Sequence, residues 1–124
     1  MDQSTLVSSG QGLVTAMDAS GFGPRLAMWV HNPDTDTWKL WLVPPAGKKD
    51  KAEFYRRIVQ IVSKQRAELG NIDAGDTEMV LDTHPAVQGL SKFMRIPGLG
   101  NASFPGNLFD GFYLPDGIIL RSDV

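Results

Sequence analysis

The 124-residue sequence contains no cysteine. Disulfides, cysteine nucleophiles and zinc sites with cysteine ligands are therefore excluded. A small secreted scaffold held together by disulfides is excluded for the same reason. A chain of this length buries roughly 65–70% of the surface that its unfolded form exposes, so we expect it to fold without such cross-links.

Long apolar runs are also missing. The longest, Trp41–Ala46, contains Pro44 and Pro45, and no run approaches the roughly 20 apolar residues that span a bilayer. Residues Met1–Thr5 have neither the basic region nor the apolar region of a signal peptide. From these features we expect a cytoplasmic protein without a membrane partner.

What is present is the composition of a globular protein, with 42% hydrophobic and 21% charged residues. No repeat, low-complexity tract or linker divides it, so residues 1–124 are predicted to form a single domain. The net charge is −2, but seven of the twelve basic residues and two of the fourteen acidic ones lie between Lys48 and Arg66. One segment is therefore basic in an otherwise acidic chain, whereas a domain that coats nucleic acid usually has a positive excess overall.

Apolar residues at helical spacing predict three helices. They cover residues 4–19, 50–69 and 85–94. Ser4 or Thr5 is expected to cap the first helix, because a hydroxyl oxygen accepts a hydrogen bond from the free N–H groups of the first turn. The second helix begins after the cap Asp50 and ends at Gly70, a residue that tolerates left-handed backbone. Pro85 starts the third helix.

Two strands over residues 25–31 and 37–43 form a hairpin around the turn Asn32–Asp36, where Asn and Asp side chains bond to their own backbone. Apolar side chains occupy both faces of the second strand. One face carries Trp38, Leu40 and Leu42, and the other carries Trp41 and Val43. A hairpin that is apolar on both faces must be covered on both, by helices or by a partner chain.

The remaining segments complete the predicted fold. They are a short strand over 77–82, a glycine- and proline-rich loop over 97–107, and a second hairpin formed by 108–114 and 118–121 around the turn Pro115–Gly117. The element order is α-β-β-α-β-α-β-β. Interleaved helices and hairpins of this kind predict an α+β domain, with a mostly antiparallel sheet and helices packed on one face of it.

The tryptophans Trp29, Trp38 and Trp41 are the candidate residues of a protein interface. Tryptophan is enriched at the centres of interfaces, and a hairpin that is apolar on both faces offers surface to another chain. Packing in the core is the alternative interpretation, for Trp29 and Trp41 in particular.

The basic segment supplies a second set of candidates. Lys49, Arg56, Arg57 and Lys64 are the residues expected to contact phosphates or an acidic partner. The alternative is that they form the solvated face of an amphipathic helix, which is the usual role of surface charge.

A third set consists of Glu78, Asp82 and His84. Two carboxylates and a histidine are able to bind a divalent metal or to transfer protons. Their spacing matches no strong metal motif, however, and Asp82–Pro85 is also typical of the start of a helix. No cofactor and no resident metal ion are therefore predicted.

The leading hypothesis is a small non-enzymatic protein-interaction or adaptor domain, which acts by binding another macromolecule or a second copy of itself. The first alternative is a nucleic-acid-associated protein that uses the basic helix over 49–66. The second alternative is a metal-dependent hydrolase at Glu78, Asp82 and His84.

Overall fold

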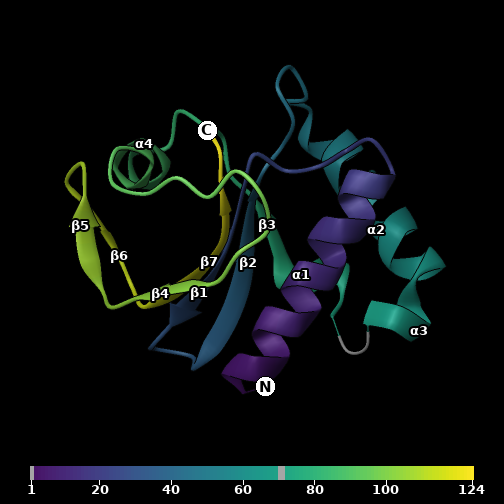
Figure 1. Ribbon diagram of the computed structural model, residues 1–124, viewed down its shortest axis with the longest axis horizontal. Coiled ribbons are helices and arrows are strands. Elements are labelled where there is room, and N and C mark those ends of the chain that lie inside the picture. Colours follow the sequence, from purple (N-terminus) through teal and green to yellow (C-terminus); the bar gives the residue numbers. More distant parts are fainter. Residues whose placement is uncertain (1, 70–71) are drawn as a thin grey trace.

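The computed structural model describes residues 2–69 and 72–124 (Figure 1). A five-stranded sheet has the strand order β3-β2-β1-β7-β4. Its strands are β1 (Leu26–Asn32), β2 (Thr37–Val43), β3 (Thr77–Met79), β4 (Ala102–Phe104) and β7 (Gly117–Ser122). All neighbouring strands are antiparallel except β3, which runs parallel to β2.

Both faces of this sheet are covered (Figure 1). One face carries the helices α1 (Gln3–Ala19), α2 (Lys51–Lys64) and α3 (Arg66–Leu69), and the 3-10 turn η1 (Ala74–Asp76) leads into β3. The other face carries the helix α4 (Pro85–Ser91) and a separate hairpin formed by β5 (Asn107–Phe109) and β6 (Phe112–Leu114). The predicted α+β class and mostly antiparallel sheet are confirmed, but helices pack on both faces rather than on one.

Strand β1 is the centre of both cores, because residues 26–30 are all buried. Ala27 and Trp29 belong to the core beneath α1 and α2, and Leu26, Met28 and Val30 belong to the core beneath α4 and the β5–β6 hairpin. Strand β2 alternates in the same way, as its sequence predicts. A hairpin with two apolar faces is thus covered on each of them.

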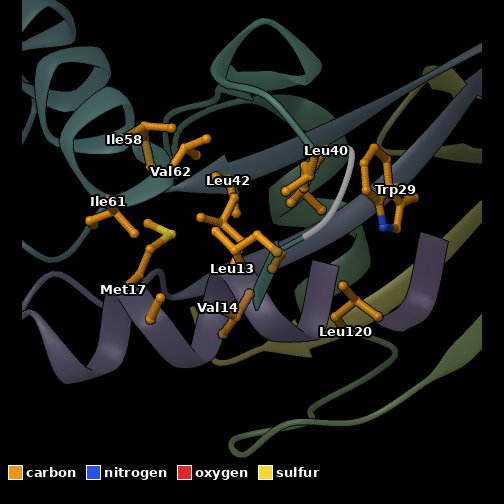
Figure 2. Packing of buried hydrophobic residues seen from close by; sticks show 14 of the residues in the cluster. Leu13, Val14, Met17, Trp29, Leu40, Leu42, Ile58, Ile61, Val62 and Leu120 are labelled. Carbon is orange, nitrogen blue, oxygen red and sulfur yellow. The ribbon is translucent and has the colours of Figure 1, made fainter. Parts of the chain in front are cut away.

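The first core is formed where α1 and α2 meet the sheet (Figure 2). The labelled side chains that converge there come from α1, α2 and β2: Leu13, Val14, Met17, Ile58, Ile61, Val62, Leu40 and Leu42. All of them are at least 94% buried. Each such side chain contributes about 1.5–3 kcal/mol when it is fully removed from water, so this layer is a main source of the stability of the fold.

Helix α1 lies unusually close to β1 and β7 at Gly10. The Trp29 indole N–H donates a 2.7 Å hydrogen bond to the backbone oxygen of Leu6, one turn earlier in α1. A Cβ atom at Gly10 would lie 2.5 Å from Leu120 Cδ1 and 2.7 Å from Trp29 Nε1. Glycine at this position therefore permits the contact that joins α1 to the sheet, although glycine weakens a helix in isolation.

The caps of the helices show one difference from the prediction. Asp2, rather than Ser4 or Thr5, caps α1, and its carboxylate accepts a hydrogen bond from the Thr5 N–H. A carboxylate also interacts favourably with the positive end of the helix dipole, which a neutral hydroxyl does not. Asp50 caps α2 as predicted, accepting hydrogen bonds from two N–H groups of the first turn.

Several predicted segments are shorter in the structure. The helix predicted over 50–69 is divided at Gln65, where α2 ends and the single turn of α3 follows. Its predicted cap, Gly70, lies outside the described residues. The third helix ends at Ser91 and strand β3 ends at Met79, so both predictions were a few residues too long.

The predicted second hairpin is wrong. Strand β7 does not pair with residues 108–114 but lies between β1 and β4 in the large sheet. Residues 107–114 instead fold back on themselves around Asp110 and Gly111, which have φ angles of 48° and 80°. Asp-Gly is the preferred sequence of a tight hairpin turn with two left-handed residues, and this local signal was missed. The predicted loop over 97–107 also contains strand β4.

We expect Gly10→Ala to destabilise the protein by about 1–3 kcal/mol, because the added methyl group must displace a side chain in a packed core. Trp29 cannot move away without losing its hydrogen bond to α1. The matched control is Ser8→Ala, at an exposed position of the same helix, which should be neutral or stabilising by a few tenths of a kcal/mol. Urea unfolding of the three proteins measures both effects, and a stabilised Gly10→Ala protein would contradict this packing.

Candidate functional site

On the face of the sheet that carries α4 and the β5–β6 hairpin, these elements do not reach across all of β2 and β3. A cleft lies between the β5–β6 hairpin and strands β2 and β3. It consists of two adjoining lobes of about 460 and 430 Å³. Trp41, Glu78 and Phe112 line both lobes. Ligand pockets in proteins commonly have volumes on the order of 300–1,000 Å³ and apolar or aromatic walls, so this cleft has the size and character of a binding site.

Three aromatic rings from distant parts of the sequence meet in the cleft. Trp41 is on β2, His84 precedes α4, and Phe112 begins β6. The centroid of the His84 ring lies 5.4 Å from that of Trp41 and 4.7 Å from that of Phe112, with interplanar angles of 69° and 75°. Edge-to-face contacts of this kind are favourable for aromatic rings, and here they fix the position of Trp41 and Phe112 relative to each other.

His84 also serves as the cap of α4. Its Nδ1 accepts a 3.1 Å hydrogen bond from the Ala86 N–H, so in the neutral ring the proton is on Nε2. Burial lowers the pKa of His84 below its usual value of 6.5, and the negative charge of Glu78 opposes part of this change. The cap, which needs an unprotonated Nδ1, and the lowered pKa both favour the neutral ring.

The edge of the cleft is exposed and mostly apolar. Tyr113 is 60% exposed and Phe112 is 36% exposed. Two further exposed apolar side chains do not line the cleft: Leu108, which pairs with Tyr113 across the β5–β6 hairpin, is 63% exposed, and Phe93, whose ring contacts that of Phe109, is 77% exposed. Exposed aromatic side chains at the edge of a cleft are characteristic of protein-interaction sites.

The three predicted interface tryptophans occupy different environments. Trp29 is 1% exposed and lies in the first core, so it presents no surface to a partner. Trp38 is half-buried on the same side of the sheet, with its ring centroid 4.8 Å from that of His31. Trp41 lies on the opposite face and lines the cleft. Alternation along the strands separates Trp41 from the other two.

The predicted basic residues differ in their environments, although Arg57 and Lys64 line one shallow depression. Arg57 lies 4.7 Å over the Phe22 ring and donates a hydrogen bond to the backbone oxygen of Ser20, so it holds α2 against the end of α1. Lys49, Arg56 and Lys64 are exposed to solvent. Exposed lysines and arginines on a helix are also what solubility requires.

The predicted trio Glu78, Asp82 and His84 is not assembled as a metal site. Asp82 forms an ion pair with Arg25 at 3.1 Å, and His84 Nδ1 is used by the helix cap. Within residues 2–69 and 72–124, no three His, Asp or Glu side chains are placed to hold one metal ion. Glu78 and His84 contribute instead to the aromatic cleft.

A second depression lies between α1 and the terminal strand β4. Its two parts, of about 460 and 370 Å³, share Gln3, Ser103 and Ile118. The part nearer to α1 is lined mainly by serine, glutamine and asparagine side chains. Since hydrated polar side chains release little free energy when a partner covers them, this part is a weaker candidate site than the aromatic cleft.

Comparison of the chain with known protein families, with curated proteins and with solved structures finds no match. In the part of the chain that the structure describes, no helix combines the length and the apolar character needed to cross a membrane.

We expect His84 to make the protein less stable in acid. Because the folded state lowers the pKa of His84, the unfolded chain binds more protons, so stability falls as the pH drops below about 6.5 towards the folded-state value. His84→Asn keeps a good helix cap and removes the titrating ring. Urea unfolding at pH 7.5 and pH 5 should therefore show a smaller acid loss for this variant, and equal losses would contradict the assignment.

Proposed function

We propose that this chain is a non-enzymatic protein-interaction domain of the cytoplasm, and that a partner protein binds at the aromatic cleft. The observation that carries the proposal is an aromatic cleft with exposed rings at its edge. Trp41 and Phe112 line the cleft, and the exposed ring of Tyr113 extends its edge. Interfaces commonly combine a few aromatic anchors with a surrounding rim that excludes water.

The energetics favour covering this surface. Apolar surface contributes about 25 cal/mol for each Å² removed from water, and aromatic side chains bury more area than most others. The rings of the cleft are held in place by the His84 contacts, so little side-chain entropy is lost when a partner binds. A partner therefore gains most of the favourable contact without reordering the cleft.

Two polar groups beside the cleft, His84 and Asp82, are engaged within the fold. His84 uses Nδ1 to cap α4, and Asp82 is paired with Arg25. A general acid or base needs a free proton-transfer atom directed at a substrate. These two groups instead stabilise the wall of the cleft.

The experiment is an affinity capture from a lysate of the native host, with nuclease-treated and untreated halves. Tyr113→Ser removes an exposed ring at the edge of the cleft, and Val59→Ser removes a 50% exposed apolar side chain on α2 as the matched control. We expect one protein to be retained by the wild type and by Val59→Ser in both halves. Its recovery should fall roughly tenfold with Tyr113→Ser, which corresponds to loss of one interface hot spot.

Two results would contradict the proposal. In the first, the Tyr113→Ser protein has the circular dichroism spectrum of the wild type and captures the partner protein as well as the wild type does. The other is capture that disappears with nuclease and depends on Arg56 and Lys64, which would favour the nucleic-acid alternative and its characteristic salt dependence.

A further inference from the structure

The charged side chains of the cleft are mostly acidic. Asp34 and Glu78 line it together with Lys39. The Lys39 ammonium group donates a hydrogen bond to the backbone oxygen of Gly75 in η1, just before β3. Within the described residues neither Asp34 nor Glu78 forms an ion pair. Two exposed carboxylates thus lie beside the aromatic rings without a positive partner from residues 2–69 and 72–124.

Other charged groups near the cleft do not reverse this balance. Arg25 is neutralised by Asp82, with which it forms an ion pair at 3.1 Å. His84 caps α4 through an unprotonated Nδ1, and burial lowers its pKa, so both favour the neutral ring. The second lobe is therefore lined by one charged side chain, Glu78, and by apolar or neutral groups.

From this arrangement we infer that the partner inserts an arginine side chain into the cleft, against the Trp41 and Phe112 rings and beside the Glu78 carboxylate. The inference rests on the proposed function and names the chemistry of the partner residue. A cation placed over an aromatic face is attracted by the negative charge density of the ring, and tryptophan is the best ring for this contact.

Arginine fits the cleft better than the other classes of side chain. An acidic residue would be repelled by Asp34 and Glu78. A purely apolar residue would remove water from the Glu78 carboxylate without supplying a hydrogen-bond donor, which is unfavourable. The guanidinium group stacks on aromatic rings, donates two hydrogen bonds to one carboxylate and is less strongly hydrated than the ammonium group of lysine.

The test uses the full chain and two synthetic peptides. One is acetyl-Gly-Arg-Gly-Arg-Gly-amide, and the other has citrulline, a neutral analogue of similar shape, in place of each arginine. Each is titrated into labelled protein while the indole N–H signal of Trp41 is followed by NMR. Trp41→Phe identifies this signal among the three tryptophans.

We expect the arginine peptide to shift the Trp41 signal in a saturable manner, and the citrulline peptide to bind roughly tenfold more weakly because the cation is lost. Glu78→Gln should weaken the arginine peptide roughly threefold, in line with the loss of an exposed ion pair. Glu53→Gln removes the same charge from α2, in the opposite layer, and should have no effect.

Equal shifts with both peptides, or no shift of Trp41 with either, would overturn the inference. The proposed function would then still be decided by the capture experiment. Capture that depends on Tyr113 without a response to the arginine peptide means that the site is correct and the arginine chemistry is wrong. A response of Trp41 to the arginine peptide without such capture means that the cleft recognises arginine but that the proposed function is wrong.

Discussion

Burial of strand β1 on both faces is the constraint on which the rest of the structure depends. Residues 26–30 are apolar without alternation, so a single layer of helices cannot cover them. Helices α1 and α2 cover one face, and Gly10 allows α1 to approach closely enough for Trp29 to bond to it. The other face is covered by smaller elements, namely a seven-residue helix and a hairpin with strands of three residues.

The cleft is a consequence of this smaller cover. The β5–β6 hairpin and α4 cover β1 and β7 but leave part of β2 and β3 open, so Trp41 is covered only in part. His84 connects the two sides of the opening, because it begins α4 and also contacts both Trp41 and Phe112. The same histidine thus stabilises the second layer and shapes the surface that we propose for the partner.

Local signals in the sequence predicted the elements that depend on local interactions. The β1–β2 hairpin and the Asp50 cap of α2 were identified because turn residues and alternation act over a few positions. The position of β7 in the large sheet was not predicted. Pro115–Gly117 is compatible with a hairpin turn, and only the long-range pairing of β7 with β1 excludes that hairpin. The sequence identified Trp41 as a candidate interface residue. Its contact with His84 and Phe112 is determined by tertiary packing.

The central claim is that the open part of the second face is completed by another protein. The most direct measurement places the photoreactive residue p-benzoylphenylalanine in place of Tyr113, and separately in place of Val59, and irradiates cells of the native host. Because Tyr113 is at the edge of the cleft and Val59 is on α2, the account predicts a covalent adduct with one protein from position 113 and none from position 59. Adducts from position 59 alone, or from neither position, would contradict it.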